Sequence, residues 1–145
     1  MLLRDERQAA LNRVETLCIN SADDYASAAT QTDDAALAAL FEQLGQERRG
    51  MAEALAPHIR ALGDLPQDPD PDREALDHVV VGLKALLSGD GGATLVEHRL
   101  RAEDALREAV LAAQDADLPE HTHAALAGML AGIDRARARL LEIRA

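Results

Sequence analysis

Apolar residues recur every three or four positions along four long stretches of the chain, with polar residues between them. This spacing places the apolar residues of each stretch on one face of an α-helix. The pattern predicts helices over residues 5–30, 33–62, 93–115 and 119–143, and a shorter amphipathic helix over residues 72–88. The predicted buried faces are Leu11, Val14, Cys18, Ala22, Tyr25 and Ala29; Leu37, Leu40, Leu44, Met51, Leu55 and Leu62, with Glu47 among them; Val96, Leu100, Glu103, Leu106, Val110 and Ala113; and Leu126, Leu130, Ile133, Leu140 and Ile143.

Local signals mark several helix ends. Asp5 with Gln8, and Thr94 with Glu97, have the spacing of a capping box, in which each side chain satisfies a backbone N–H that has no partner inside the helix. Gly63 follows the second stretch, as expected of a glycine that ends a helix in the left-handed conformation. These signals favour the predicted boundaries.

The lengths of the connections predict the topology. The first and second helices, and the third and fourth, are joined by links of a few residues, so each pair forms an antiparallel hairpin. The link between the hairpins is long, and its first part contains Pro66, Pro69 and Pro71, which favour an extended backbone. We therefore predict one all-α domain over residues 1–145, a four-helix bundle of ferritin-like connectivity with a short helix in the crossover.

Composition narrows the class of partner and the compartment. Fifteen Lys and Arg against 26 Asp and Glu give a net charge of −11, which repels phosphate backbones and anionic membranes, so we expect neither nucleic acid nor a membrane as partner. One Phe, one Tyr and no Trp disfavour strands. The single Cys18 has no partner for an intramolecular disulfide, and the N-terminus has no apolar signal region, so we expect a cytoplasmic protein.

Six short segments carry a resemblance to a known family. They are Leu11-Asn12-Arg13-Val14-Glu15, Leu40-Phe41, Leu62-Gly63, Leu83-Lys84-Ala85-Leu86-Leu87-Ser88-Gly89, Arg101-Ala102-Glu103-Asp104-Ala105-Leu106 and Asp117-Leu118-Pro119. Together they resemble a family of small bacterial ferritin-like bundles of unknown function. The resemblance implies a ferritin-like fold, no established activity, and an ancestor with a di-metal centre.

A ferritin-like di-metal site needs a Glu on each of two helices and Glu-x-x-His on each of the other two. Glu47 and Glu103 lie near the middle of the second and third predicted helices, but neither is followed three residues later by His. Glu15 and Asp134 lie one position away from the predicted faces of the first and fourth helices. These four carboxylates are the candidate ligands of an Fe or Mn site, and the set is incomplete.

Three other interpretations account for the two central carboxylates. Arginines such as Arg48, Arg99 or Arg137 can pair with them in a buried polar network, or the carboxylates can flank the buried face and reach solvent. Without a cation between them, Glu47 and Glu103 facing each other would share a proton, because repulsion and burial raise the pKa of one of them.

The remaining motifs have structural explanations. Glu120 and His123 form the one Glu-x-x-His in the chain, in the first turn of the fourth helix, where capping and solvation explain them and metal binding would be adventitious. Cys18 lies on a predicted buried face, where it acts as a small apolar residue.

Together these observations predict a non-enzymatic, cytoplasmic ferritin-like bundle without a cofactor, acting through self-association, most simply as a homodimer, or through another protein. The apolar face of residues 72–88 supports association. The alternative is a di-metal (Fe or Mn) binding protein or oxidoreductase that uses Glu47, Glu103, Glu15 and Asp134.

Overall fold

The computed structural model describes residues 4–67 and 91–144, and everything below concerns these residues. They form four α-helices and no strand, which confirms the all-α class. The predicted boundaries of the four long helices are within two residues of those observed, and the predicted helix over residues 72–88 lies outside the described residues. The helices are α1 (Glu6–Thr30), α2 (Ala35–Ala61), α4 (Gly91–Gln114) and α5 (Glu120–Arg144).

Both ends of the first hairpin are fixed by local hydrogen bonds. Asp5 accepts from the backbone N–H of Gln8 at 2.8 Å while the Gln8 side chain accepts from the N–H of Asp5 at 3.0 Å, so the predicted capping box is present. Gly63 has φ +82°, and the N–H of Asp64 reaches back to the carbonyl of Ile59. This is the glycine-terminated helix end that the sequence predicts.

The start of α4 differs from the prediction. The helix begins at Gly91, three residues before Thr94, so Thr94 lies inside the helix and is not its N-cap. The capping-box interpretation of Thr94 and Glu97 was therefore wrong. Glu97 instead accepts a hydrogen bond from Arg144 at the far end of α5.

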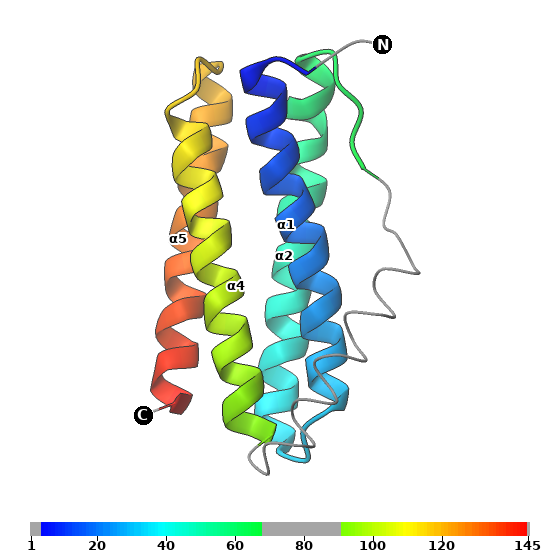
Figure 1. The fold of residues 1–145 in the computed structure, drawn as a ribbon, viewed down its shortest axis with the longest axis vertical. Coiled ribbons are helices and arrows are strands. Elements are labelled where there is room, and N and C mark those ends of the chain that lie inside the picture. The colour runs from blue at the N-terminus through cyan, green and yellow to red at the C-terminus, as the bar shows by residue number, and fades with distance from the viewer. Residues whose placement is uncertain (1–3, 68–90, 145) are drawn as a thin grey trace.

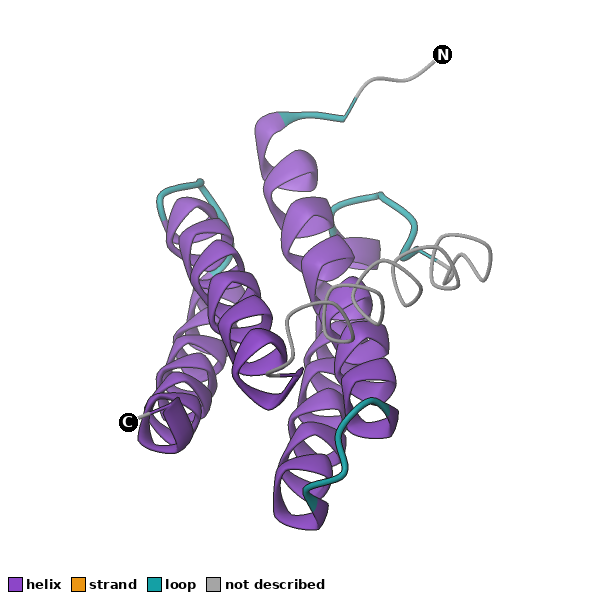
Figure 2. Cartoon of the chain, turned by 60° about the horizontal axis from the view of Figure 1, so that its bottom comes forward, coloured by secondary structure: helices purple, strands orange, loops and turns teal. Residues whose placement is uncertain are grey.

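The four helices lie side by side as two antiparallel hairpins, α1 with α2 and α4 with α5 (Figure 1). The tilted view separates the two hairpins clearly (Figure 2). Contact between the hairpins runs mainly through α1 and α4. Because α2 ends and α4 begins at opposite ends of the bundle, these two helices run parallel to each other.

Helices α1 and α2 approach closely at a glycine. A Cβ placed on Gly45 would lie 3.0 Å from Cβ of Tyr25 and 3.2 Å from the carbonyl oxygen of Ala22. Only a residue without a side chain allows this separation of the two backbones. Gly50, five residues further along α2, faces open space.

The core consists of two apolar clusters, one toward each end of the bundle. On α2 the clusters meet between Leu44 and Ala52, and on α4 they meet between Leu100 and Leu106. The first cluster is built around Leu11, Val14, Cys18, Leu55, Ile59, Leu106, Val110, Leu126 and Ile133, and the second around Tyr25, Leu37, Leu40, Phe41, Leu44, Leu95, Val96, Leu100 and Leu140.

The predicted buried faces of the first and third long helices are confirmed, since every residue named for them is buried. The other two faces were partly wrong. In α2, Met51 and Leu62 are half-buried, and in α5 Leu130 is half-buried and Ile143 is exposed. Residues missed by the pattern fill the core in their place: Phe41, Arg48, Ala52, Ile59, Met129 and Ala136.

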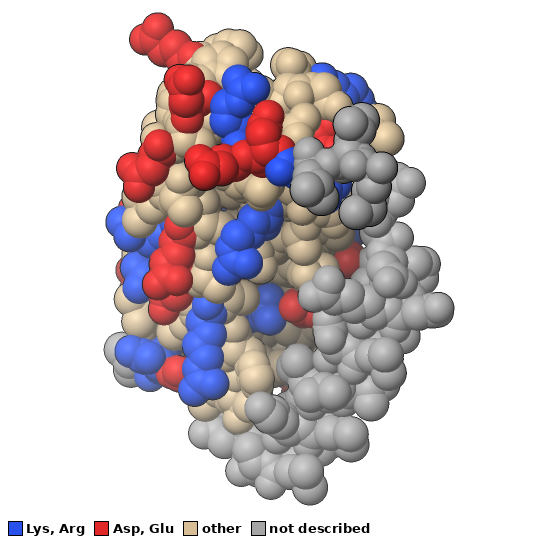
Figure 3. Space-filling model, turned by 45° about the horizontal axis from the view of Figure 1, so that its top comes forward, with Lys and Arg blue, Asp and Glu red and all other residues tan. Residues whose placement is uncertain are grey.

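Exposed ion pairs connect α4 to α5 along their outer side. They are Arg107–Asp134 at 2.9 Å, Arg137–Asp104 at 2.6 Å and Arg144–Glu97 at 2.9 Å. From one ion pair to the next, the residue in α4 moves toward the N-terminus by as many positions as its partner in α5 moves toward the C-terminus. This is expected for antiparallel neighbours. Acidic and basic side chains are interspersed on the face seen in Figure 3. None of the helices in the described ranges is long and apolar enough to span a bilayer.

Candidate functional site

A buried ion pair lies between the two apolar clusters. Arg48 of α2 donates from Nε to Oε1 of Glu103 at 2.9 Å and from Nη2 to Oε2 at 2.7 Å. Both side chains are 0% exposed. The two parallel bonds match the planar guanidinium to the planar carboxylate, which is the strongest geometry for such a pair.

Tyr25 and Arg99 extend this pair into a network that joins three helices. The hydroxyl of Tyr25 in α1 donates to Oε1 of Glu103 in α4 at 2.7 Å. The guanidinium carbon of Arg99, also in α4, lies 5.1 Å from the centre of the Tyr25 ring, and Arg99 pairs with Asp24 at 3.4 Å. The face of the Tyr25 ring thus contacts the guanidinium of Arg99. The Tyr25 hydroxyl binds the carboxylate of Glu103, which balances the charge of Arg48.

Burial and pairing determine the protonation states in this network. Burial lowers the pKa of Arg48, but the hydrogen bonds and charge of Glu103 more than compensate, so the pKa of Arg48 is raised overall. Burial, reinforced by the Glu103 charge, raises the pKa of Tyr25 well above its ordinary value, so its hydroxyl remains a donor. Burial also raises the pKa of the Cys18 thiol to about 12, so it is not a nucleophile at neutral pH.

The four candidate metal ligands do not converge. Glu103 is inside and paired with Arg48, as the arginine-network interpretation predicts. Glu47 is exposed, beside Gln43, and its assignment to the buried face was wrong. Adjacent helical positions point about 100° apart. Arg48 faces the core, and Glu47 faces solvent.

The other two candidates lie apart from Glu103 as well. Asp134 is exposed and pairs with Arg107. Glu15 is only 2% exposed, and its Oε1 accepts from the backbone N–H of Gln67 at 2.9 Å. In the part of the chain that the structure describes, no three His, Cys, Asp or Glu side chains are grouped so that they could hold a metal ion. These four carboxylates therefore do not come together as the ligands of one di-metal centre.

The histidines near the start of α5 are engaged locally. His123 lies 2.6 Å from the side-chain oxygen of Gln114, and His58 lies 2.7 Å from the hydroxyl of Thr122. The ring of His121 is 5.1 Å from that of His58. Burial, followed by the neighbouring His121, lowers the pKa of His58. The contacts of His58 tie α2 to α5 at this end of the bundle, and His123 ties α5 to Gln114 of α4.

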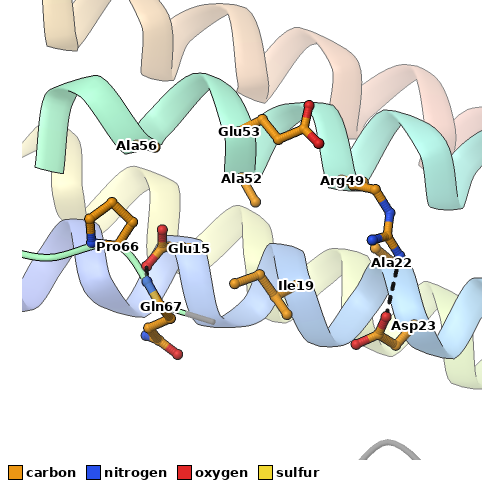
Figure 4. A pocket seen from close by; sticks show the side chains of 10 residues that line it. All are labelled: Glu15, Ile19, Ala22, Asp23, Arg49, Ala52, Glu53, Ala56, Pro66 and Gln67. Carbon is orange, nitrogen blue, oxygen red and sulfur yellow. Dashed lines mark hydrogen bonds and ion pairs between the residues drawn. The ribbon is translucent and has the colours of Figure 1, made fainter. Parts of the chain in front are cut away.

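A cavity of about 230 Å³ opens along the seam between α1 and α2, at the point where the chain leaves α2. Glu15 and Gln67 lie at one end, and Arg49 and Asp23 form an ion pair at the other, at 3.4 Å (Figure 4). The full lining is Glu15, Ile19, Ala22, Asp23, Arg49, Ala52, Glu53, Ala56, Pro66 and Gln67.

Sequence reasoning identified Glu103 and Glu15 but missed the roles of Tyr25 and Gln67. Arg48 was named only as one possible partner. It stands four residues after Leu44 and four before Ala52, so that spacing could have placed it on the buried face. The approach of Gln67 to Glu15, 52 residues apart, has no signal in the local pattern.

Fold and site together define an all-helical domain whose central polar side chains are paired with one another. The family profile described as a domain of unknown function (DUF2383) matches residues 7–115, and the chain belongs to this family. The matched range contains α1, α2 and α4, and with them every residue of the Arg48–Glu103 network. No curated protein and no solved structure matches the chain.

Proposed function

We propose that this protein is a non-catalytic bundle of ferritin-like connectivity in the bacterial cytoplasm, acting through association, most simply with a second copy of itself. The Arg48–Glu103 pair carries the non-catalytic part. A guanidinium already occupies both oxygens of the central carboxylate, and the Tyr25 hydroxyl adds a third hydrogen bond. A buried charge satisfied in this way serves structure, because the hydrogen bonds of the Glu103 carboxylate are already made within the network.

The outer side of the α4–α5 hairpin supports the association part. Leu111 is seven residues after Asp104, and Leu141 is four residues after Arg137, so both leucines share the face of the exposed ion pairs. Their exposed fractions are 40% and 38%. A face that carries both charge signs and exposed leucines can complement the same face of a second copy, as a two-fold dimer requires.

Light scattering coupled to size-exclusion chromatography tests this proposal. We expect twice the chain mass of 15.5 kDa at tens of micromolar protein. Leu111→Glu with Leu141→Glu should yield the single-chain mass. Leu65→Glu, the same change at an exposed position outside α4 and α5, should leave the dimer intact. A wild-type monomer, or a dimer indifferent to the α4–α5 variant, contradicts self-association through this face.

The di-metal alternative requires a different arrangement of the carboxylates. It needs Glu103, Glu15, Glu47 and Asp134 to share two ions, whereas these side chains occupy the core, the α1–α2 cavity and two exposed positions. Elemental analysis of protein purified without a tag tests it directly. About two Fe or Mn per chain would overturn the non-catalytic proposal.

A further inference from the structure

The carboxylate of Glu15 is the only central acid candidate that is both buried and incompletely partnered among the described residues. One oxygen accepts from the N–H of Gln67. The other points away from Gln67 toward α2 (Figure 4), and no described residue donates a hydrogen bond to it. Glu15 as a whole residue is 2% exposed and lines the cavity, so a donor that enters the cavity can pair with this oxygen.

The cavity beside Glu15 has the shape of a short channel. Glu15, Ile19 and Asp23 lie on successive turns of α1, which spreads them over about 12 Å along the seam. The middle is apolar, formed by the side chains of Ile19, Ala22, Ala52 and Ala56. A volume of about 230 Å³ holds roughly eight water-sized groups, so it accommodates a small linear molecule.

The charges around the cavity select the sign of its occupant. Among the described residues that line it, the carboxylates of Glu15, Asp23 and Glu53 outnumber the guanidinium of Arg49, which is paired with Asp23. The chain as a whole carries a net charge of −11, which attracts small cations. The cavity does not suit a compact metal ion, because among the described residues no three potential ligands are grouped here.

We propose that this cavity binds a linear primary ammonium ion of four to six carbons, with the ammonium on the free oxygen of Glu15 and the alkyl chain along Ile19, Ala22 and Ala52. The ammonium supplies the donor that Glu15 lacks, and the alkyl chain removes apolar surface of the channel from water. The Arg49–Asp23 pair closes the far end and limits the length of the chain.

The protonation behaviour of Glu15 agrees with this assignment. Burial raises the pKa of Glu15, while the hydrogen bond from Gln67 works in the opposite direction. A cation beside the carboxylate favours its charged form. Binding should therefore strengthen as the pH rises through the pKa of Glu15, because the free protein must release its proton before the ammonium ion can pair with it.

Titration of the full-length chain with n-pentylammonium chloride, followed by amide NMR, tests the site. The N–H of Gln67 reports on the Glu15 carboxylate directly, so its signal should shift and saturate together with those of Ile19 and Ala52. Pentan-1-ol, which has the same chain without the charge, should bind at least tenfold more weakly. Equal binding of the alcohol, or no saturable shift with the ammonium ion, overturns the proposal.

Two pairs of variants separate the site from general charge and fold. Glu15→Gln keeps an oxygen for the Gln67 N–H and should weaken n-pentylammonium binding at least tenfold, whereas Glu47→Gln, an equal change of charge at an exposed position, should leave it unchanged. Ala56→Met fills the channel and should also abolish binding with Glu15 intact. Ala54→Met, exposed on the same helix and outside the lining, should not. Binding that survives both Glu15→Gln and Ala56→Met refutes the site.

Discussion

Removing the charge of Glu103 should reveal the energetic role of the buried network. Glu103→Gln keeps the size of the side chain and one oxygen for the Tyr25 hydroxyl, but it leaves the guanidinium of Arg48 buried at 0% exposure without a counterion. Breaking a buried pair in this way typically costs about 3–5 kcal/mol. Since domains are stable by only about 5–15 kcal/mol, this is a large fraction of the total.

Urea unfolding followed by circular dichroism measures the loss of free energy, and thermal unfolding measures the change in melting temperature. For a domain near 150 residues, roughly 2–4 °C of melting temperature per kcal/mol predicts a drop of about 6–20 °C for Glu103→Gln. Glu108→Gln removes the same charge from an exposed position of α4 and should change stability by less than about 0.5 kcal/mol.

A triple variant tests whether the effect comes from the unpaired charge. The variant combines Arg48→Met, Glu103→Leu and Tyr25→Phe. It removes the guanidinium, the carboxylate and the hydroxyl that bind one another and leaves apolar side chains of similar size. Replacing a buried ion pair by packed apolar residues is often neutral or stabilising by about 1–4 kcal/mol. The triple variant should therefore be more stable than Glu103→Gln. If Glu103→Gln loses under about 1 kcal/mol, or the triple variant is the less stable of the two, the reasoning is refuted.

Two further predictions concern α1 and α2. Gly45→Ala should destabilise the protein by about 1–3 kcal/mol in urea unfolding, because its Cβ would press against Tyr25. Gly50→Ala should stabilise the protein by about 0.5–1 kcal/mol, because Gly50 faces open space. Equal effects of the two substitutions would contradict the close approach of the helices. Because the pKa of Glu15 is raised in the folded protein, the folded state holds its proton more tightly, and the contribution of Glu15 to stability should fall as the pH rises from its ordinary pKa through the raised value. The stability difference between wild type and Glu15→Gln, measured at about pH 4, 5, 6 and 7, should decrease over that range, and a flat or rising difference would show that the folded-state pKa is not raised.

Periodicity alone recovered the helices and most of the core, because burial of one helical face is a local property of the sequence. It was wrong at Glu47 and Arg48, where the apolar spacing is interrupted and two neighbouring charged residues compete for the same interior position. The sequence rule that buried positions are apolar favours neither of them. The choice follows from Glu103 on another helix, because a buried carboxylate needs a cation opposite it.

The α1–α2 cavity was beyond sequence reasoning for a different reason. Glu15 was predicted to lie one position from the buried face, although it follows Leu11 by four residues and precedes Cys18 by three, which is the spacing of that face. It is enclosed because Pro66 and Gln67, at the exit from α2, fold back over α1. Such a contact depends on the path of a loop, which the spacing of apolar residues does not encode. In contrast, Ile143 was placed in the core by spacing alone, although α5 ends there and has little left to pack against.

The forked pairing of Arg48 with Glu103 also has a consequence for alignment. Seams of leucine and alanine are repetitive, so two helices joined only by them could slide past each other by one turn, about 5.4 Å, and find similar packing. A slip of one turn would separate the Arg48 guanidinium from the Glu103 carboxylate and leave both charges buried without their partner. The Arg48–Glu103 pair therefore favours a single alignment of one hairpin against the other along the helix axes.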